Sequence, residues 1–123
     1  MKRKHNFKGL QIWQKGRVLV KDIYQLTSEF PKSELYGLVS QMRRASVSIP
    51  SNIAEGSGRK TSKEFSRFLE IAYSSALELE TQLYLSFDLS FISESTLDEF
   101  LFKIEEVQKM ISSFDNKILA DNI

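Results

Sequence analysis

At 123 residues, the chain is long enough for one domain and too short for two joined by a linker. Apolar residues make up 41% and charged residues 27%, with a net charge of +1, a mixture typical of a globular chain rather than a disordered one. The absence of cysteine excludes disulfides, thiolate metal sites and cysteine nucleophiles. We therefore expect a single domain over residues 1–123.

The first residues of the chain are basic, as in a secretory signal peptide, but the apolar segment of a signal peptide does not follow them. Met1–His5 is basic, but Lys8, Lys15 and Arg17 interrupt the residues after it, so no apolar run of signal-peptide length is present. The longest uncharged stretch, Ala45–Ala54, is far shorter than the roughly 20 apolar residues of a membrane helix. We expect a basic tail over about residues 1–7 of a cytoplasmic protein that has no membrane partner.

Two amphipathic helices are expected in the first half of the chain. Apolar residues recur at helical spacing and predict helices over residues 8–29 and 34–56, the first of them ended by Pro31. Pro50 falls inside the second helix, where it removes a backbone hydrogen bond, so we expect a kink or a break there. The glycines of residues 56–58 are expected to end this helix in the left-handed conformation.

Two further helices are predicted over residues 62–90 and 96–119. Each begins at a capping-box pattern, Thr61–Glu64 and Thr96–Glu99, in which the threonine oxygen accepts from a free backbone amide. Because the connections are short, consecutive helices must fold back on each other. The sequence predicts an all-α, antiparallel up-down-up-down four-helix bundle with a proline distortion in its second helix.

No group of residues in the sequence indicates an active site. His5 is the only histidine, so a histidine-containing metal site inside the bundle is not expected. Glu78 and Glu80 are two residues apart on a helix and point to different faces, so they cannot share a metal ion. Neither a Gly-x-Ser-x-Gly turn nor a phosphate-binding Gly-x-x-x-x-Gly-Lys loop is present. We expect no catalytic residues, no metal, no cofactor and no enzymatic activity.

Charge is divided unevenly along the chain. Residues 1–60 contain 12 Lys or Arg and four acids, a balance of +8, whereas residues 61–123 contain five basic and 12 acidic residues, a balance of −7. This division is consistent with a polyanionic partner, with a self-complementary assembly, or with helices that neutralise one another inside one bundle.

The segment over residues 41–56 has a composition unusual for a bundle helix, with three serines, an asparagine and a proline. Ser48, Ser51 and Asn52 are expected to satisfy the backbone groups that Pro50 frees.

Packing within the segment leaves one of its two consecutive arginines unexplained. Arg43 and Arg44 diverge by about 100° on a helix and cannot serve the same neighbour. One of them is expected to form an ion pair with Glu70 or Glu78 on the third helix. The other is expected to face solvent, another subunit or a ligand.

Several strings of the sequence resemble the bacterial family of 23S rRNA intervening-sequence proteins over about residues 7–90. The most specific string is Ser48-Ile49-Pro50-Ser51-Asn52-Ile53-Ala54-Glu55-Gly56. Further matching strings are Trp13-Gln14-Lys15, Tyr36-Gly37-Leu38, Arg43-Arg44-Ala45 and Glu78-Leu79-Glu80-Thr81-Gln82-Leu83. Gly16 stands where family members usually carry alanine.

The resemblance implies a small bundle that associates into a ring-like pentamer and whose biochemical role is not established. It also implies genes found within sequences that interrupt bacterial large-subunit ribosomal RNA. A related branch, the accessory variability protein of diversity-generating retroelements, looks like the same bundle. That branch works as a basic partner of a reverse transcriptase and its nucleic acid.

Two hypotheses about function are consistent with these features. The first is a non-enzymatic homo-oligomer that binds RNA or DNA, or serves as an adaptor for a nucleic-acid-processing protein, with the Lys2-Arg3-Lys4 tail as an additional phosphate contact. Its candidate contacts are Lys15, Arg43, Arg44, Arg59 and Lys60. The alternative is a purely structural oligomer or protein-interaction module in which basic helices of one subunit meet acidic helices of the next.

Self-association is expected under both hypotheses. Five large apolar residues lie off the main core stripes and predict an exposed apolar patch: Trp13, Val20, Tyr24, Phe68 and Ile71.

Overall fold

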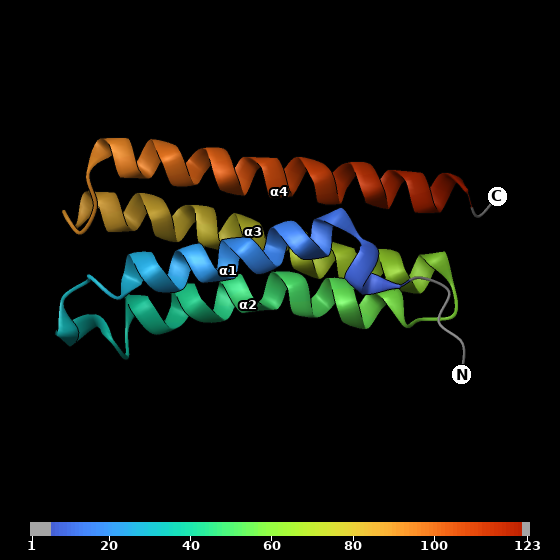
Figure 1. The fold of residues 1–123 in the computed structure, drawn as a ribbon, viewed down its shortest axis with the longest axis horizontal. Coiled ribbons are helices and arrows are strands. Elements are labelled where there is room, and N and C mark those ends of the chain that lie inside the picture. Colours follow the sequence, from blue (N-terminus) through green and yellow to red (C-terminus); the bar gives the residue numbers. More distant parts are fainter. Residues whose placement is uncertain (1–5, 122–123) are drawn as a thin grey trace.

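A computed structural model describes residues 6–121 and contains four α-helices and two short 3-10 helices (Figure 1). The 3-10 helix η1 precedes α1, and η2 lies between α1 and α2. No β-strand occurs within the described residues, so the predicted all-α fold is confirmed. The bounds of the elements are η1 Phe7–Gly9, α1 Gln11–Thr27, η2 Lys32–Glu34, α2 Leu38–Ser57, α3 Ser62–Asp88 and α4 Glu94–Ala120.

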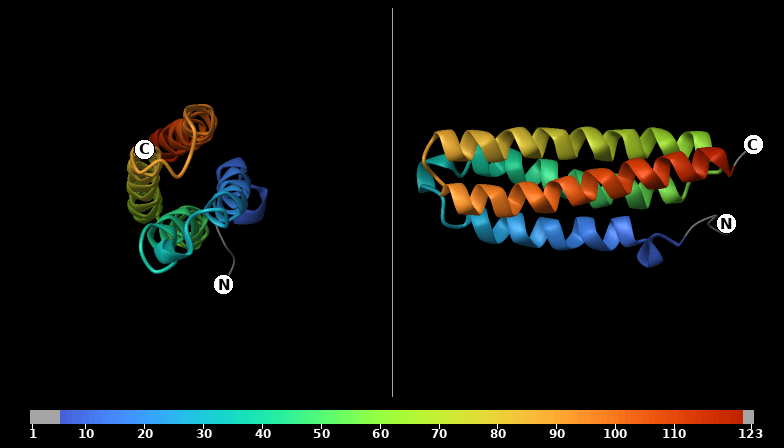
Figure 2. Two further views of the ribbon diagram at one scale, coloured as in Figure 1. Left: turned by 90° about the vertical axis from the view of Figure 1, so that its left-hand side faces the viewer. Right: turned by 90° about the horizontal axis from the view of Figure 1, so that it is seen from above.

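Consecutive helices run antiparallel, and their order around the core follows the chain (Figures 1 and 2). The packing of α1 on α2 shows the direction, because Gly16 lies against Ile49 whereas Thr27 lies against the earlier residue Arg43. The helices α2, α3 and α4 pack extensively on their chain neighbours, while α1 packs less on α4. The seam between α1 and α4 is therefore the least extensive of the four.

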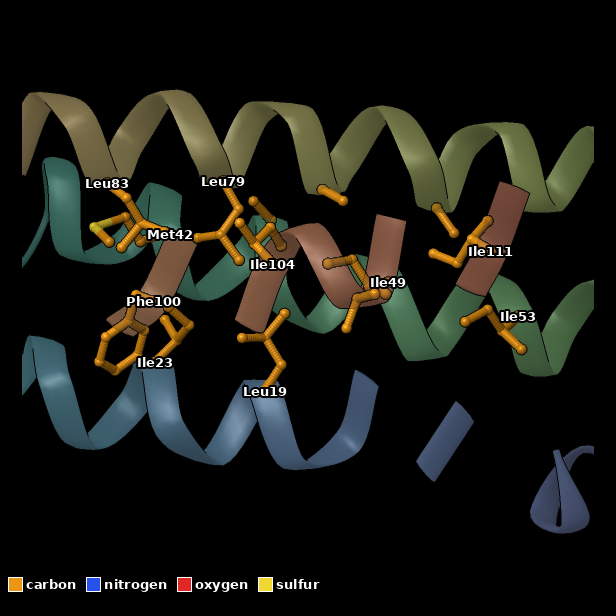
Figure 3. Packing of buried hydrophobic residues seen from close by; sticks show 14 of the residues in the cluster. Leu19, Ile23, Met42, Ile49, Ile53, Leu79, Leu83, Phe100, Ile104 and Ile111 are labelled. Carbon is orange, nitrogen blue, oxygen red and sulfur yellow. The ribbon is translucent and has the colours of Figure 1, made fainter. Parts of the chain in front are cut away.

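The apolar stripes predicted from the sequence meet in the core (Figure 3). The stripe along α3 is buried throughout, and Phe30 beyond the end of α1 is buried against Phe91. The residues of this stripe, which recur at helical spacing in the sequence, are Phe65, Leu69, Ala72, Ala76, Leu79 and Leu83. Complete burial of a large apolar side chain contributes about 1.5–3 kcal/mol, so this core supplies most of the stabilisation. Large apolar side chains that are completely buried are Ile23, Met42, Ile49, Ile53, Leu69, Leu79, Leu83 and Ile104.

The starts of α3 and α4 were predicted with different success. Thr61 caps α3 as predicted, with its Oγ1 accepting from the backbone amide of Glu64 at 3.1 Å. The second capping box is wrong, because α4 begins at Glu94 and its cap is Ser93, whose Oγ accepts from the amide of Thr96 at 3.2 Å. Ser93 and Thr96 are both good caps by type, and the cap at Ser93 lengthens the helix by a first turn that contains the acidic Glu94.

The ends of α2 and α3 also differ from the expected pattern. The left-handed glycine cap predicted for residues 56–58 is wrong, since Gly58 has φ of −87° and no described glycine has a positive φ. The left-handed residue is instead Ser90 after α3, with φ of 65°. The amide of Phe91 donates to the carbonyl of Ser86 at 2.9 Å, which completes a Schellman-type cap.

The first half of the chain is less regular than predicted. The helix α1 begins at Gln11 rather than residue 8, because Asn6 caps the separate turn of η1. The helix α2 begins at Leu38 rather than residue 34, because η2 takes up the preceding residues. Since α2 is continuous through Pro50, the expected break is wrong, and a kink without a break stays a prediction.

Candidate functional site

Arg43 fastens α2 to the end of α1. Its Nε donates to Thr27 Oγ1 at 3.0 Å, its Nη2 donates to the Tyr24 carbonyl at 3.4 Å, and its guanidinium lies 4.5 Å from the centre of the Tyr24 ring. A cation at a helix C-terminus is favourable because the carbonyls there carry partial negative charge. One arginine is thus structural as predicted, but its partner is α1 and not Glu70 or Glu78.

Arg44 is the exposed member of the pair. It lines a hollow of about 350 Å³ between α2 and α3, together with Ser48, Ser75 and Glu78. The predicted position opposite α3 is therefore correct, but the guanidinium of Arg44 forms no hydrogen bond or ion pair with any residue that the structure describes. Its charge is available to a ligand or another subunit.

Arg59 and Lys60 lie in the turn between α2 and α3. The guanidinium of Arg59 stacks on Phe68, 4.6 Å from the ring centre, and its Nη2 lies 4.0 Å from a carboxylate oxygen of Glu55. Lys60 is exposed and forms no ion pair with a described residue. An exposed ion pair contributes only about 0–1 kcal/mol, so both cations stay accessible to phosphate groups.

Lys15 is engaged by the opposite helix. Its Nζ lies 3.2 Å from Oε1 of Glu106 on α4, and both side chains are about half exposed. A second link between the same helices joins Lys103 to Asp22 at 3.0 Å. Around these residues, neutralisation within the bundle accounts for the opposite charges of the two halves of the chain.

The ammonium of Lys103 lies between two carboxylates. Its Nζ is 3.0 Å from Asp22 and 3.3 Å from Glu99, which lies one turn away on α4. Burial alone would lower the pKa of Lys103, but the hydrogen bonds and negative charges of the two carboxylates outweigh it and raise the pKa above 10.5. The link between α1 and α4 therefore keeps its charge through the neutral range.

Polar residues of the central segment join α2 to α3. The hydroxyls of Ser48 and Ser75 lie 2.8 Å apart, and the side-chain amide of Asn52 donates to the Ser48 carbonyl at 2.8 Å. The carbonyl that Pro50 leaves without an amide is that of Ser46, four residues earlier. The expected satisfaction of this group by Asn52 is wrong, because the asparagine side chain is bonded to the carbonyl of Ser48 instead.

The end of the segment is fixed by packing. Gly56 is buried, and a Cβ atom there would lie 2.7 Å from Cβ of Phe68 and 2.8 Å from the ring of Phe65. Only glycine permits this approach of α2 to α3. Ser51 and Glu55 lie on the exposed side, and the hydroxyl of Ser51 forms no hydrogen bond to another described residue, so its predicted role at the proline is also wrong.

An apolar groove of about 330 Å³, here termed the α1–α2 groove, opens on the surface between these helices. Its walls include Trp13, Arg17, Val20, Val47, Pro50 and Ala54. The guanidinium of Arg17 lies 5.5 Å from the centre of the Trp13 ring. The sequence had not indicated that Val47 and Pro50 belong to an exposed apolar surface.

The predicted apolar patch is divided in the structure. Trp13 and Val20 share the α1–α2 groove. Tyr24 lies under Arg43, and Phe68 lies under Arg59 at the junction of α2 and α3. Val20 and Tyr24 are one turn apart on α1, whereas Phe68 and the exposed Ile71 lie on α3, so the five predicted residues are divided between two helices.

Neither a metal cluster nor a membrane span occurs over residues 6–121. No group of three or more His, Cys, Asp or Glu side chains is placed to hold a metal ion within that range. None of its helices combines the length and the apolar composition that a transmembrane span requires. His5 and the predicted phosphate-binding tail Lys2-Arg3-Lys4 lie outside the described residues.

Residues 8–113 match the family model described as 23S rRNA-intervening sequence protein. The chain belongs to this family. The 23S rRNA-intervening sequence fold is also that of a protein of unknown function from the S23 ribosomal protein family of Bacteroides thetaiotaomicron, with a TM-score of 0.79 and 22% identity. The alignment covers 85% of this chain and 95% of that protein, and at this identity it shows the fold alone. No curated protein matches the chain in sequence.

Proposed function

We propose that this family member is a non-enzymatic oligomeric adaptor that assembles with copies of itself through the α1–α2 groove. The observation that carries the proposal is the apolar lining of the groove, in which Trp13, Val47 and Pro50 come together on the outside of the bundle. Apolar residues gathered on a surface rimmed by polar residues are characteristic of interaction sites. The ring-like pentamer implied by the family resemblance is the expected assembly.

The charges around the groove support a closed assembly. Arg17 lies at the groove with no ion pair to a described residue, and most of the acidic residues lie on α3 and α4. A surface that contacts a different surface of the next copy generates a ring when the rotation closes. Basic and acidic faces on different helices favour this head-to-tail contact over a symmetric dimer, in which like charges would meet.

Two matched variants test the assembly. Val47 is 39% exposed in the α1–α2 groove, and Leu119 is 41% exposed near the end of α4. Val47→Glu is expected to give monomers of 14.2 kDa by light scattering, whereas Leu119→Glu is expected to keep the wild-type mass. A wild-type protein that is monomeric at micromolar concentration, or a Val47→Glu protein that assembles like the wild type, would contradict the proposal.

A second candidate function is binding of RNA or DNA without base specificity. It is supported by three exposed cations that lie at or near the α2–α3 surface, Arg44, Arg59 and Lys60. Two of the five candidate contacts from the sequence are left out of this set. Arg43 is engaged by the hydroxyl of Thr27 on α1, and Lys15 forms an ion pair with Glu106. Repetition of the three cations around a ring would place several phosphate contacts on one surface.

Salt dependence tests this second function. Arg59→Ala with Lys60→Ala is expected to weaken binding and to reduce the log–log salt slope by about 0.9 per lost contact on duplex DNA, or about 0.7 on single strands. Lys109→Ala with Lys117→Ala removes the same charge from α4 and serves as the control. No binding to RNA or DNA at low salt by the intact oligomer would leave the purely structural function in place.

A further inference from the structure

A second apolar groove lies between the beginning of α1 and the last turns of α4, which meet at the same end of the bundle (Figure 2). Its volume is about 460 Å³, and its apolar surface comes from Leu10 and Ile12 on one side and Met110 and Phe114 on the other. This volume is within the range of about 300–1,000 Å³ that small-molecule sites occupy. We term it the α1–α4 groove, and it is distinct from the α1–α2 groove.

The rim of the α1–α4 groove is cationic. Lys109 and Lys117 are both exposed and line it, and they are eight residues apart, so they lie on the same side of α4. Neither forms an ion pair with a described residue. Of the two acidic residues one turn before Lys109 on α4, Glu106 pairs with Lys15, and Glu105 lines a separate hollow with Lys109 without forming an ion pair with it. Neither lysine is therefore held by a described carboxylate within ion-pair distance.

The other wall of the α1–α4 groove adds positive potential. It includes the first turn of α1, whose cap Leu10 forms no side-chain cap hydrogen bond and which contains no acidic residue. The partial positive charge of this helix end is therefore not compensated locally. Its contribution reinforces the two lysines.

We propose that the α1–α4 groove binds a single-chain anionic amphiphile of the fatty-acid class, in monomeric form. The alkyl chain lies against the apolar walls formed by Leu10, Met110 and Phe114, and the carboxylate lies beside Lys109 or Lys117. Apolar walls alone would bind any apolar group, and lysines alone would bind any anion. The two together select a molecule with both features, and the basic rim disfavours a cationic amphiphile.

Calorimetric titration of the full chain with decanoate, kept below its micelle concentration, tests the proposal. The charge-reversed pair Lys109→Glu and Lys117→Glu is expected to bind decanoate at least about tenfold more weakly. Lys21→Glu with Lys32→Glu changes the net charge equally, but at exposed positions remote from the groove. This control is expected to keep the affinity within about twofold of wild type.

A steric variant provides a second test that leaves the charges unchanged. Gly9 lines the groove, and a Cβ atom there would meet nothing within 4 Å, so Gly9→Leu adds bulk at the groove with open space around its Cβ atom. It is expected to weaken decanoate binding at least about tenfold while circular dichroism stays that of the wild type. Acetate, which lacks the chain, and decyltrimethylammonium, which inverts the charge, are expected to bind at least about tenfold more weakly than decanoate.

Five results would overturn the proposal. Four of them are no decanoate binding by the wild type, equal binding by the folded groove variants, equal affinity for decyltrimethylammonium, and association with decanoate-containing vesicles but not with the monomer. Displacement of decanoate by an acidic, apolar peptide of higher affinity would also overturn it, because the occupant would then be a protein segment. All of these outcomes can be read independently of oligomer size and of nucleic-acid binding.

Discussion

Two buried glycines receive opposite predictions for the same substitution to alanine. Gly16 lies in the middle of α1, where a Cβ atom would be 3.4 Å from Cγ2 of Ile49 and 3.5 Å from the ring of Pro50. These are ordinary van der Waals distances, so no atom has to move. Alanine is better than glycine in a helix interior by about 1 kcal/mol, because the unfolded chain loses less freedom. Gly16→Ala is therefore expected to stabilise the protein by about 1 kcal/mol.

At Gly56 the same change introduces an overlap. The new Cβ atom would lie 2.7 Å from Cβ of Phe68, which is attached directly to the backbone of α3 and cannot rotate away. Overpacking of this kind costs about 1–3 kcal/mol or more, which exceeds the gain of about 1 kcal/mol from helix propensity. Gly56→Ala is therefore expected to destabilise the protein by about 1–2 kcal/mol.

Urea unfolding of the two variants and the wild type, followed by circular dichroism and by Trp13 fluorescence, measures both changes. A fixed protein concentration is needed, because self-association would stabilise the folded state by mass action. The urea midpoint is expected to rise for Gly16→Ala and to fall for Gly56→Ala, and in thermal unfolding the gain at Gly16 corresponds to a rise of about 4 °C in the midpoint. A lower midpoint for Gly16→Ala, or an unchanged one for Gly56→Ala, would refute the argument from Cβ distances.

Three further predictions concern the cap of α3, the paired arginines and the link between α1 and α4. Ser90→Gly is expected to raise the free energy of unfolding by about 1 kcal/mol in thermal denaturation, because it relieves the left-handed conformation. Arg43→Met is expected to lower this free energy by about 1–3 kcal/mol in urea, whereas Arg44→Met changes it by less than about 0.5 kcal/mol. Because the pKa of Lys103 is raised in the folded protein, its charged ammonium stabilises the fold fully at pH values below the ordinary lysine pKa of 10.5. This stabilisation is lost as the pH rises through the higher pKa of the folded state. Asp22→Asn removes one of the two carboxylates, so the urea midpoint of this variant is expected to fall less than that of the wild type as the pH is raised through this range.

The number of helices and their buried faces could be predicted from the sequence because apolar periodicity is a local property. The stripe from Phe65 to Leu83 could be read without knowing its partners, and all of it is buried. The ends were harder, because several residues compete for each cap. Ser93 and Thr96 are both good caps by type, and the structure uses the first. A left-handed residue was expected among the glycines after α2, but the connection after α3 imposes it on Ser90.

The candidate site was less predictable because it depends on how the helices are rotated about their axes. Sequence reasoning established that Arg43 and Arg44 face different ways, but it could not say which one faces inward or toward which helix. Arg43 reaches carbonyl and hydroxyl groups at the end of α1, which carry no charge that a charge-pairing argument could detect. Similarly, the α1–α2 groove depends on Trp13 and Pro50, two residues far apart in sequence that only the packed pair of helices brings together.

The limited seam between α1 and α4 has a consequence for how the chain folds. Most packing joins helices that are consecutive in sequence, and proteins dominated by such contacts fold rapidly, within about microseconds to milliseconds. Contacts across the seam are different, since Asp22 and Lys103 are 81 residues apart. Closing that long loop has the largest entropic cost of the fold, so we expect the seam to form last. The same step in reverse is the first opening of the native protein, and amides of α1 should exchange with solvent before those of α2 and α3.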